Sequence, residues 1–288
     1  MKAYSIDTGK FKLDGGAMFG VVPKSIWNKS NPADENNLCT WALRCLLVIE
    51  GERKILIDTG MGSKQDEKFF SHYHPHETVS LTTALQKLNI ATADITDVLL
   101  THLHFDHVGG AVIKEKENLS LQFPNATYWV SEPQWNEAMQ PNRREKASFL
   151  AENILPLQQS GQLKIISLPQ FDSSNQLHEI HFSPSISCFV VNGHTKGMLI
   201  PKITLGEEQL VFMADLLPSI GHIPLPYIMG YDMQPLITLA EKELFLKQAV
   251  QNHYTLFFEH DAQHECCTLQ ETEKGIRLKA TFNLATLV

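Results

Sequence analysis

Short runs of apolar and β-branched residues alternate with polar stretches of helical type along the 288-residue chain. Two such runs, 39–49 and 54–57, flank the turn Gly51-Glu52, and this arrangement predicts a β-hairpin. Apolar positions three and four residues apart predict a helix over 80–88. A second helix is expected over 237–251, with Thr238 as its cap. The other strand-like runs are 98–101, 128–130, 163–168, 186–191, 197–203, 209–213 and 255–258.

The strands and helices occur in two successive halves of the chain. This order predicts an α/β (α+β) protein with two sheets packed face to face and helices outside. No linker-like stretch or internal repeat divides the sequence, so we expect one domain over 1–288. Within this domain we expect an N-terminal arm over about 1–37 and a helical insertion over about 131–160.

The segment Thr-His-Leu-His-Phe-Asp-His at 101–107 carries most of the chemistry, because it holds three histidines and one aspartate. It directly follows the strand-like run 97–100. Alternate positions of an extended segment point the same way, so His102 and His104 can reach one metal ion. Asp106 and His107, on the following turn, can reach a second ion. Imidazole and carboxylate ligands suit zinc or a similar divalent metal.

Three isolated residues of metal-binding type follow other apolar strands. They are His194 after 188–191, Asp215 after 210–214, and His260 after 255–259. A carboxylate at the end of a buried strand is poorly solvated unless it has a partner. Each of these residues taken alone favours a structural role, but clusters at the ends of several apolar strands together favour a metal site.

In this order the residues resemble the hallmark of the metallo-β-lactamase-fold hydrolases, His-x-His-x-Asp-His followed by His, Asp and His. Asp58-Thr59-Gly60 resembles the first motif of the same superfamily. The resemblance implies a four-layer αββα sandwich with two metal ions at one edge. It implies that Asp58 orients a ligand imidazole from behind. The implied ligands are His102, His104 and His194 for the first ion, Asp106, His107 and His260 for the second, and Asp215 for both.

Two such ions would provide a bridging hydroxide near neutral pH, so we expect metal-assisted hydrolysis. Asp106 and Asp215 are expected to act in catalysis, with Asp106 moving a proton. Zinc is the expected metal at both positions, with Fe, Mn or Co as alternatives.

The glycine-rich apolar run 11–23 has two interpretations. It forms either an edge hairpin or a wall of an apolar substrate cavity. This run resembles the quorum-quenching lactonase and organophosphate-hydrolase branch, which implies that Met18, Phe19 and Phe105 line an apolar substrate pocket. The branch implies hydrolysis of a small, partly apolar ester or lactone, as by an N-acyl homoserine lactonase.

One residue departs from that branch. Its lactonases carry a tyrosine three residues after the bridging aspartate, where this chain has Pro218. His222 is the nearest replacement donor, with a catalytic or a structural role. A phosphotriesterase or arylesterase therefore stays an alternative.

Other classes fit the sequence less well. A di-iron redox protein of the same fold would often replace a histidine ligand and carry a partner domain, and β-lactamases commonly use cysteine at the second ion. The net charge of −8 argues against a nucleic-acid partner and leaves a small-molecule substrate. The cluster His72, His74 and His76 is expected to form a solvent or rim loop.

The chain has no run long enough for a membrane span and no apolar signal core. Its five cysteines have irregular spacing, which favours a reducing compartment, so we expect a cytoplasmic protein. Resemblance to the lactonase-like branch implies a homodimer formed through the N-terminal arm.

Overall fold

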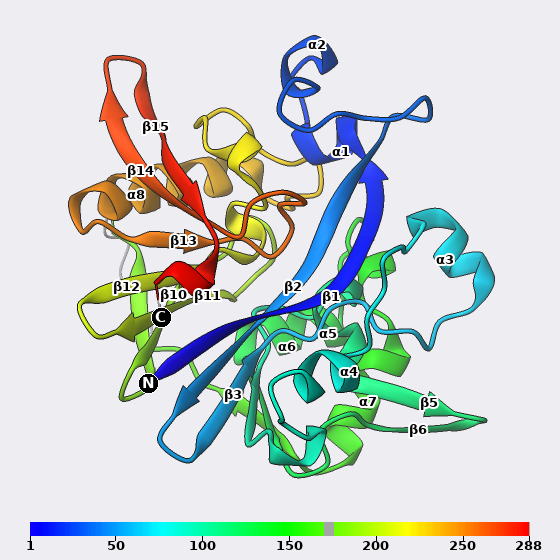
Figure 1. Ribbon diagram of the computed structural model, residues 1–288. Coiled ribbons are helices and arrows are strands. Elements are labelled where there is room, and N and C mark those ends of the chain that lie inside the picture. The colour runs from blue at the N-terminus through cyan, green and yellow to red at the C-terminus, as the bar shows by residue number, and fades with distance from the viewer. Residues whose placement is uncertain (170–175, 288) are drawn as a thin grey trace. The chain divides into compact units, whose positions relative to one another are not determined.

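The computed structural model describes residues 1–169 and 176–287, and Figure 1 labels its elements. The chain divides into two compact units, each built from two separate segments. The first unit holds residues 1–9 and 43–168, and the second holds residues 10–42 and 169–288. The boundaries fall within or next to the strands β1 (Lys2–Asp14) and β2 (Leu38–Glu50) and after Leu168. The interpretation of 1–288 as one domain stays a prediction.

A six-stranded mixed sheet in the order β1-β2-β3-β4-β7-β8 forms the core of the first unit. β2 and β3 form the expected antiparallel hairpin, while β3, β4, β7 and β8 run parallel. Ile57 and Leu99 are register partners, so the residues after β3 and after β4 leave the sheet at the same edge. The bounds are β3 Arg53–Ile57, β4 Asp97–Leu99, β7 Thr127–Ser131 and β8 Leu163–Ile166.

The helices of the first unit begin at clear caps. In α4 the Ser80 hydroxyl accepts a hydrogen bond from the Thr83 amide, and Leu81, Ala84 and Leu85 are buried. α6 packs against β7 and β8, and α7 packs against the hairpin of β5 and β6. The bounds are α3 Glu67–Tyr73, α4 Leu81–Gln86, α5 Phe105–Val108, α6 Glu132–Met139, α7 Ala151–Gln159, β5 Val112–Glu115 and β6 Asn118–Leu121.

A seven-stranded mixed sheet in the order β15-β14-β13-β12-β11-β10-β9 forms the core of the second unit. Its one parallel pair among the described strands is β12 and β13, in which Phe212 and Phe257 are register partners. Asp215 and His260 each lie three residues beyond these partners, so they leave the sheet at the same edge. The bounds are β9 His178–Ser183, β10 Ile186–Val191, β11 Met198–Leu205, β12 Glu208–Phe212, β13 Thr255–Phe257, β14 Cys266–Thr272 and β15 Gly275–Phe282.

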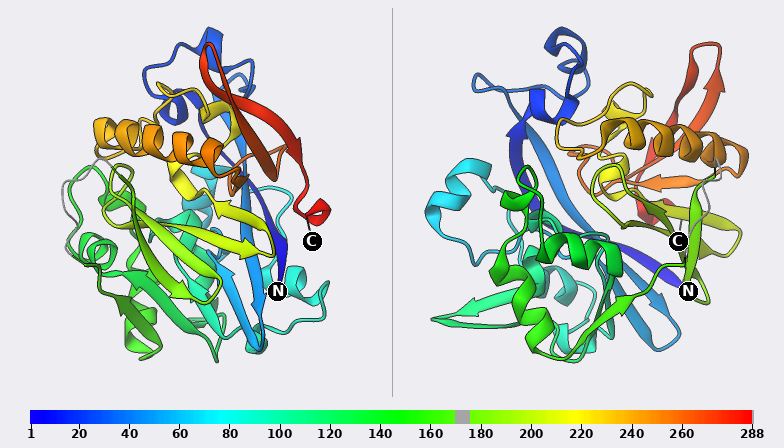
Figure 2. Two further views of the ribbon diagram at one scale, coloured as in Figure 1. Left: turned by 90° about the vertical axis from the view of Figure 1, so that its left-hand side faces the viewer. Right: turned by 180° about the vertical axis from the view of Figure 1, so that it is seen from behind.

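Among its described residues, the second unit contains the α-helices α1, α2 and α8. α8 (Pro235–Gln251) packs against β14 and β15, as Figure 2 shows. The short helices α1 (Gly15–Phe19) and α2 (Lys24–Trp27) follow β1, so the run 11–23 is not a hairpin but a strand end followed by helical turns. The Asp14 side chain caps α1 by accepting a hydrogen bond from the Ala17 amide at 2.8 Å.

The expected cap at Thr238 is wrong. The last helix begins at Pro235, whose fixed φ and missing N–H suit the first helical position, and Thr238 is buried within the helix. Among the described residues, no helix is long and apolar enough to cross a bilayer.

Candidate metal centre

In the first unit, the segment after β4 changes from extended chain to helix within its histidine motif. His104 has extended backbone angles and caps α5, whose first turn carries Asp106 and His107. All four motif residues that could bind metal are buried. The ring centroids of His102 lie 4.5 Å from His104 and 3.9 Å from His107. Buried imidazoles this close together are well suited to share bound cations.

Asp58 holds this segment from behind. It follows β3 in the left-handed region, with a φ of +56°, and its carboxylate is fully buried. Its Oδ1 accepts a hydrogen bond from the Thr101 amide at 2.7 Å, and its Oδ2 accepts one from the Thr101 hydroxyl at 2.6 Å. The Nδ1 of His107 also donates to Oδ2, at 3.1 Å. Asp58 therefore fixes both the start of the motif and the ring of His107.

A second carboxylate, Glu145, was not identified from the sequence. It is buried, and its Oε1 accepts a hydrogen bond from Nε2 of His104 at 2.9 Å. Asn142 donates to the other oxygen of Glu145 at 2.9 Å. The neighbouring Arg143 and Arg144 are exposed. The stretch 131–160 thus contributes a group that holds His104.

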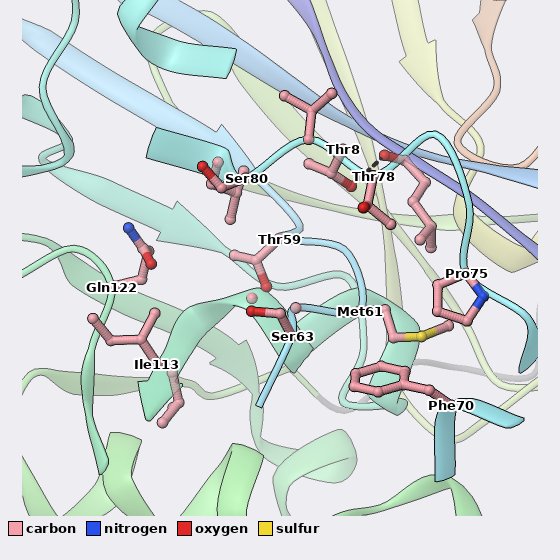
Figure 3. Close-up of a pocket in the computed structure, with 16 residues that line it drawn as sticks. Thr8, Thr59, Met61, Ser63, Phe70, Pro75, Thr78, Ser80, Ile113 and Gln122 are labelled. Atoms are coloured by element: carbon pink, nitrogen blue, oxygen red, sulfur yellow. Dashed lines mark hydrogen bonds between the residues drawn. The ribbon is translucent and has the colours of Figure 1, made fainter. Parts of the chain in front are cut away.

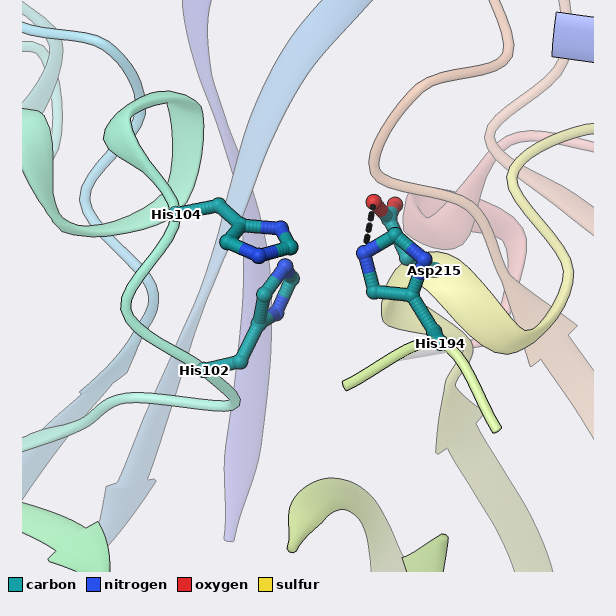
Figure 4. A group of neighbouring side chains, drawn as sticks. All are labelled: His102, His104, His194 and Asp215. Carbon is teal, nitrogen blue, oxygen red and sulfur yellow. Dashed lines mark ion pairs between the residues drawn. The ribbon is translucent and has the colours of Figure 1, made fainter. Parts of the chain in front are cut away.

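In the second unit, Asp215 lies between two imidazoles. Its Oδ2 is 3.1 Å from Nε2 of His194, and its Oδ1 is 3.1 Å from Nε2 of His260. Figure 4 shows the pair of His194 and Asp215, and separately the neighbouring rings of His102 and His104. Asp215 lies in a tight turn at Ala214–Leu216, where Ala214 has a φ of +40°. One carboxylate thus presents each oxygen to a different histidine.

The outer nitrogens of these histidines are held by other groups of the second unit. Asp232 accepts a hydrogen bond from Nδ1 of His194 at 2.9 Å, and it also accepts one from the Met229 amide at 3.2 Å. His260 donates from Nδ1 to the Ala42 carbonyl at 2.8 Å. Burial lowers the pKa of His194, but the carboxylates of Asp215 and Asp232 raise it to about 10. Asp232, like Glu145, was missed because its partner is distant in the sequence.

The hydrogen bonds define which nitrogen each histidine can offer to a metal. His102, His107, His194 and His260 use Nδ1 within the protein, since His102 Nδ1 lies 3.0 Å from the Thr101 hydroxyl. If these residues bind metal, Nε2 is the ligand nitrogen of each, and in His194 and His260 this atom faces a carboxylate oxygen of Asp215. His104 is reversed, because Glu145 holds its Nε2, so Nδ1 would be its ligand nitrogen. Orienting partners of this kind are typical of metal-binding histidines, so these residues fit divalent ions with nitrogen and oxygen ligands.

The residues expected to line a substrate pocket lie in two aromatic clusters. In the second unit, Phe19 is fully buried and stacks on Trp27 at 5.3 Å and on His222 at 4.4 Å. Met18 is buried beside it in α1. In the first unit, Phe105 packs against Tyr73 of α3, with ring centroids 4.6 Å apart. Contact of Met18, Phe19 and Phe105 with substrate stays a prediction.

His222 uses both ring nitrogens inside the second unit. Its Nε2 donates to the Met18 carbonyl at 2.9 Å, and its Nδ1 lies 2.9 Å from the Ser219 hydroxyl. Since a carbonyl can only accept, Nδ1 is the nitrogen that accepts from Ser219. Burial lowers the pKa of His222 to about 3, which keeps the ring neutral. Of the two roles expected for His222, these contacts favour the structural one.

The histidines at 72, 74 and 76 do not join a metal-binding group among the described residues. His74 ends α3 in the left-handed region, and its carbonyl lies 2.9 Å from Nδ1 of His76. His72 and His74 are exposed.

Comparison with known proteins agrees with this architecture. A model of the metallo-β-lactamase superfamily matches residues 44–113. A probable metal-dependent hydrolase from Staphylococcus aureus has a similar structure, with a TM-score of 0.86 and 28% identity over 98% of this chain and 96% of that chain. AidC, a dizinc quorum-quenching lactonase in complex with a product, gives a TM-score of 0.77 and 25% identity over 98% of this chain and 95% of that chain. An N-acyl homoserine lactonase from Bacillus cereus is 23% identical over 92% of this chain and 94% of its own length.

Residues 44–113 match the metallo-β-lactamase superfamily, and the chain has the fold of that superfamily, two mixed sheets flanked by helices. The family and the fold class expected from the sequence are therefore confirmed. The solved structures that resemble it include lactonases of N-acyl homoserine lactones. The buried histidine and aspartate residues are consistent with the two-metal type of site.

Proposed function

We propose that this protein is a metal-dependent hydrolase that holds two divalent ions and cleaves a small, partly apolar ester or lactone. The observation that carries the proposal is the orientation of the ligand histidines. Each has one ring nitrogen held by a group outside the proposed ligand set, and the Nε2 atoms of His194 and His260 face the two oxygens of Asp215.

The proposed ligand sets follow the family order. His102, His104 and His194 bind the first ion, Asp106, His107 and His260 bind the second, and Asp215 binds both. The contacts of Asp215 support its bridging role, because its two oxygens face two histidines assigned to different ions. Asp106 and His107 support the second set, since Oδ2 of Asp106 lies 3.8 Å from Nε2 of His107.

Two bound divalent ions would supply a water of lowered pKa and would polarise a carbonyl or phosphoryl oxygen. The side chains have separate tasks around that chemistry. Asp58, Glu145 and Asp232 keep the ligand rings in one orientation through their hydrogen bonds. Asp106, in the first turn of α5, would take the proton that the attacking water loses and deliver it to the leaving oxygen.

Lactone hydrolysis is the preferred reaction, because AidC is a dizinc lactonase and is 25% identical over nearly the whole chain. Zinc is the preferred metal for the same reason. Pro218 supports the alternative of a phosphotriester or aryl ester, since proline has no side-chain donor for a lactone oxygen.

Elemental analysis together with a substrate panel tests this function. The panel contains acyl lactones, phosphotriesters, aryl esters and thioesters, and the key variant is Asp215→Ala. We expect about two metal equivalents in the parent protein and at least a thousandfold loss of lactone hydrolysis in the variant. Asp7→Ala, at an exposed position, is the matched control and keeps full activity. Full activity and metal content in Asp215→Ala would overturn the proposal.

A further inference from the structure

A pocket of about 390 Å³ lies within the first unit, apart from the residues assigned to catalysis. The segment that joins α3 to α4 forms one wall, and the loops after β3 and α5 form the others. None of the seven proposed metal ligands lines it, nor do Met18, Phe19, Phe105 or His222. Its volume falls in the range of small-molecule sites, about 300–1,000 Å³.

The lining contains no ionisable side chain. Its polar groups are hydroxyls and one amide, from Thr8, Thr59, Ser63, Thr78, Ser80 and Gln122. A charged ligand would lose its hydration here without meeting an opposite charge, which is costly. The Thr8 and Thr59 hydroxyls donate within the protein and can only accept from a ligand hydroxyl. Ser63, Thr78 and Gln122 can donate to a neutral carbonyl or hydroxyl of a ligand.

The remaining lining is apolar. Met61, Leu81 and Val112 are buried and form part of it. Figure 3 shows Met61, Phe70 and Pro75 on one side of the pocket and Ile113 and Gln122 on the other. An alkyl chain can pack against such side chains and leave water.

Several contacts hold the pocket walls in place without a ligand. The Val79 amide donates to the Thr8 carbonyl at 3.1 Å, and the Thr8 hydroxyl donates to the Leu43 carbonyl at 2.7 Å. On the opposite wall, the amide and the hydroxyl of Thr59 both donate to the His107 carbonyl, at 2.7 and 2.8 Å. A pocket that is already formed costs little ordering entropy when a ligand binds.

Close backbone packing adds to this rigidity. A Cβ atom at Gly9 would lie 2.8 Å from the Cα atom of Thr78, and one at Gly62 would lie 2.6 Å from the Gly109 carbonyl oxygen. Both glycines have positive φ angles, +116° and +69°, so other residues would be strained there. The parts of the lining around Thr78 and around Gly62 are thus both packed against neighbouring backbone.

We propose that this pocket is a second ligand site, which binds a small uncharged amphipathic molecule with a carbonyl or hydroxyl head and an alkyl chain. The site is distinct from the proposed metal centre, because none of the proposed metal ligands lines it.

Calorimetric titration of the metal-loaded protein with octanamide tests the proposal. The expected Kd is about 1 mM or tighter, which is the scale for a ligand of this size. Octanoate has the same chain with a negative charge, and it serves as the charged comparison. Ser63→Trp places a bulky ring at the exposed mouth of the pocket and should weaken octanamide binding at least tenfold. Ser71→Trp, at an exposed position outside the lining, is the matched control and should leave the Kd within twofold.

Methyl NMR of isoleucine-labelled protein shows where octanamide binds. Octanamide should shift the Ile113 methyl resonance and leave that of exposed Ile237 unchanged.

Thr78→Val keeps the shape of the side chain and removes one hydroxyl, so it should weaken octanamide binding about threefold to tenfold. This variant provides a test even if Ser63→Trp folds poorly. Asp215→Ala should bind octanamide normally, so failure of the hydrolase proposal would leave this one standing. The proposal would be overturned if octanamide binding did not saturate or if neither pocket variant weakened it. It would also be overturned if octanoate bound with the same sensitivity to these variants.

Discussion

Glu145 accepts a hydrogen bond from Nε2 of His104, and this contact reverses the ring relative to the other ligand histidines. The other four use Nδ1 within the protein, whereas Nδ1 is the proposed ligand nitrogen of His104. The carboxylate comes from the stretch between α6 and α7, far from the motif in sequence. The geometry of the proposed first ion thus depends on a residue outside every motif.

Replacing this carboxylate should weaken metal binding. Glu145→Gln places an amide where a carboxylate fixed the ring, and loss of such a partner typically costs about 10–100-fold in metal affinity. Competition with a zinc chelator measures this change. Glu132→Gln, at an exposed position of α6, is the control. An unchanged zinc affinity in Glu145→Gln would show that the contact does not position His104.

Asp232 should have a comparable effect through His194. Asp232→Asn weakens the hydrogen bond to Nδ1 of His194, so the bound metal content should fall from about two equivalents toward one at limiting zinc. Elemental analysis after gel filtration measures the content. Retention of both equivalents at every zinc concentration would contradict the expected role.

Two substitutions at Asp58 separate its backbone and side-chain roles. Asparagine tolerates the left-handed conformation that Asp58 adopts, whereas alanine does not tolerate it well. Alanine also removes the acceptor of three hydrogen bonds from Thr101 and His107. We expect Asp58→Ala to lower the free energy of unfolding by about 2–5 kcal/mol, and Asp58→Asn by clearly less. Urea denaturation measures both, and equal losses would contradict this separation.

Lys242 predicts a pH dependence of stability. It is buried in α8 and donates to the carbonyls of Pro224 and Tyr227, and burial lowers its pKa to about 7 from the usual 10.5. Between these values the unfolded chain binds the proton and the folded chain does not, so stability rises with pH.

We expect the free energy of unfolding to rise by at most about 1.4 kcal/mol per pH unit because of Lys242. The variant Lys242→Met should lack this contribution to the slope. Denaturation at several pH values from 7 to 10 measures it. Parallel curves for the parent protein and the variant would exclude this assignment. Lys247→Met, at an exposed position of the same helix, should leave the slope unchanged.

His222 offers a test of its two expected roles. Removing its ring in His222→Ala leaves the Met18 carbonyl without its donor and Phe19 without its stacking partner. A loss of about 2–4 kcal/mol in the free energy of unfolding should follow. In the milder His222→Gln, a kcat within about threefold of the parent would fit a structural role, and a fall of about a hundredfold would restore the catalytic one.

The sequence identifies the histidine and aspartate residues that gather in buried clusters, because they are conspicuous after apolar runs that form buried strands. β4, β10, β12 and β13 all follow this pattern. The strand β1 is not predicted, since charged and glycine positions interrupt its alternation.

The groups that orient the ligands are harder to find. Glu145 and Asp232 lie 41 and 38 residues from the histidines that they hold, and no local spacing connects them. Polar residues in loops are common, so composition cannot distinguish the few whose partners are created by folding. The pocket beside Thr59 has the same origin, because its lining comes from strands and loops distributed from Thr8 to Gln122.

The hydrogen bond from His260 to the Ala42 carbonyl also affects the order of folding. It joins positions 218 residues apart, and the bond from His222 to the Met18 carbonyl spans 204 residues. Contacts this distant along the chain form late, because closing so large a loop costs entropy before any contact repays it. During synthesis residues 18 and 42 must therefore wait for residues 222 and 260 to emerge before these two hydrogen bonds can form.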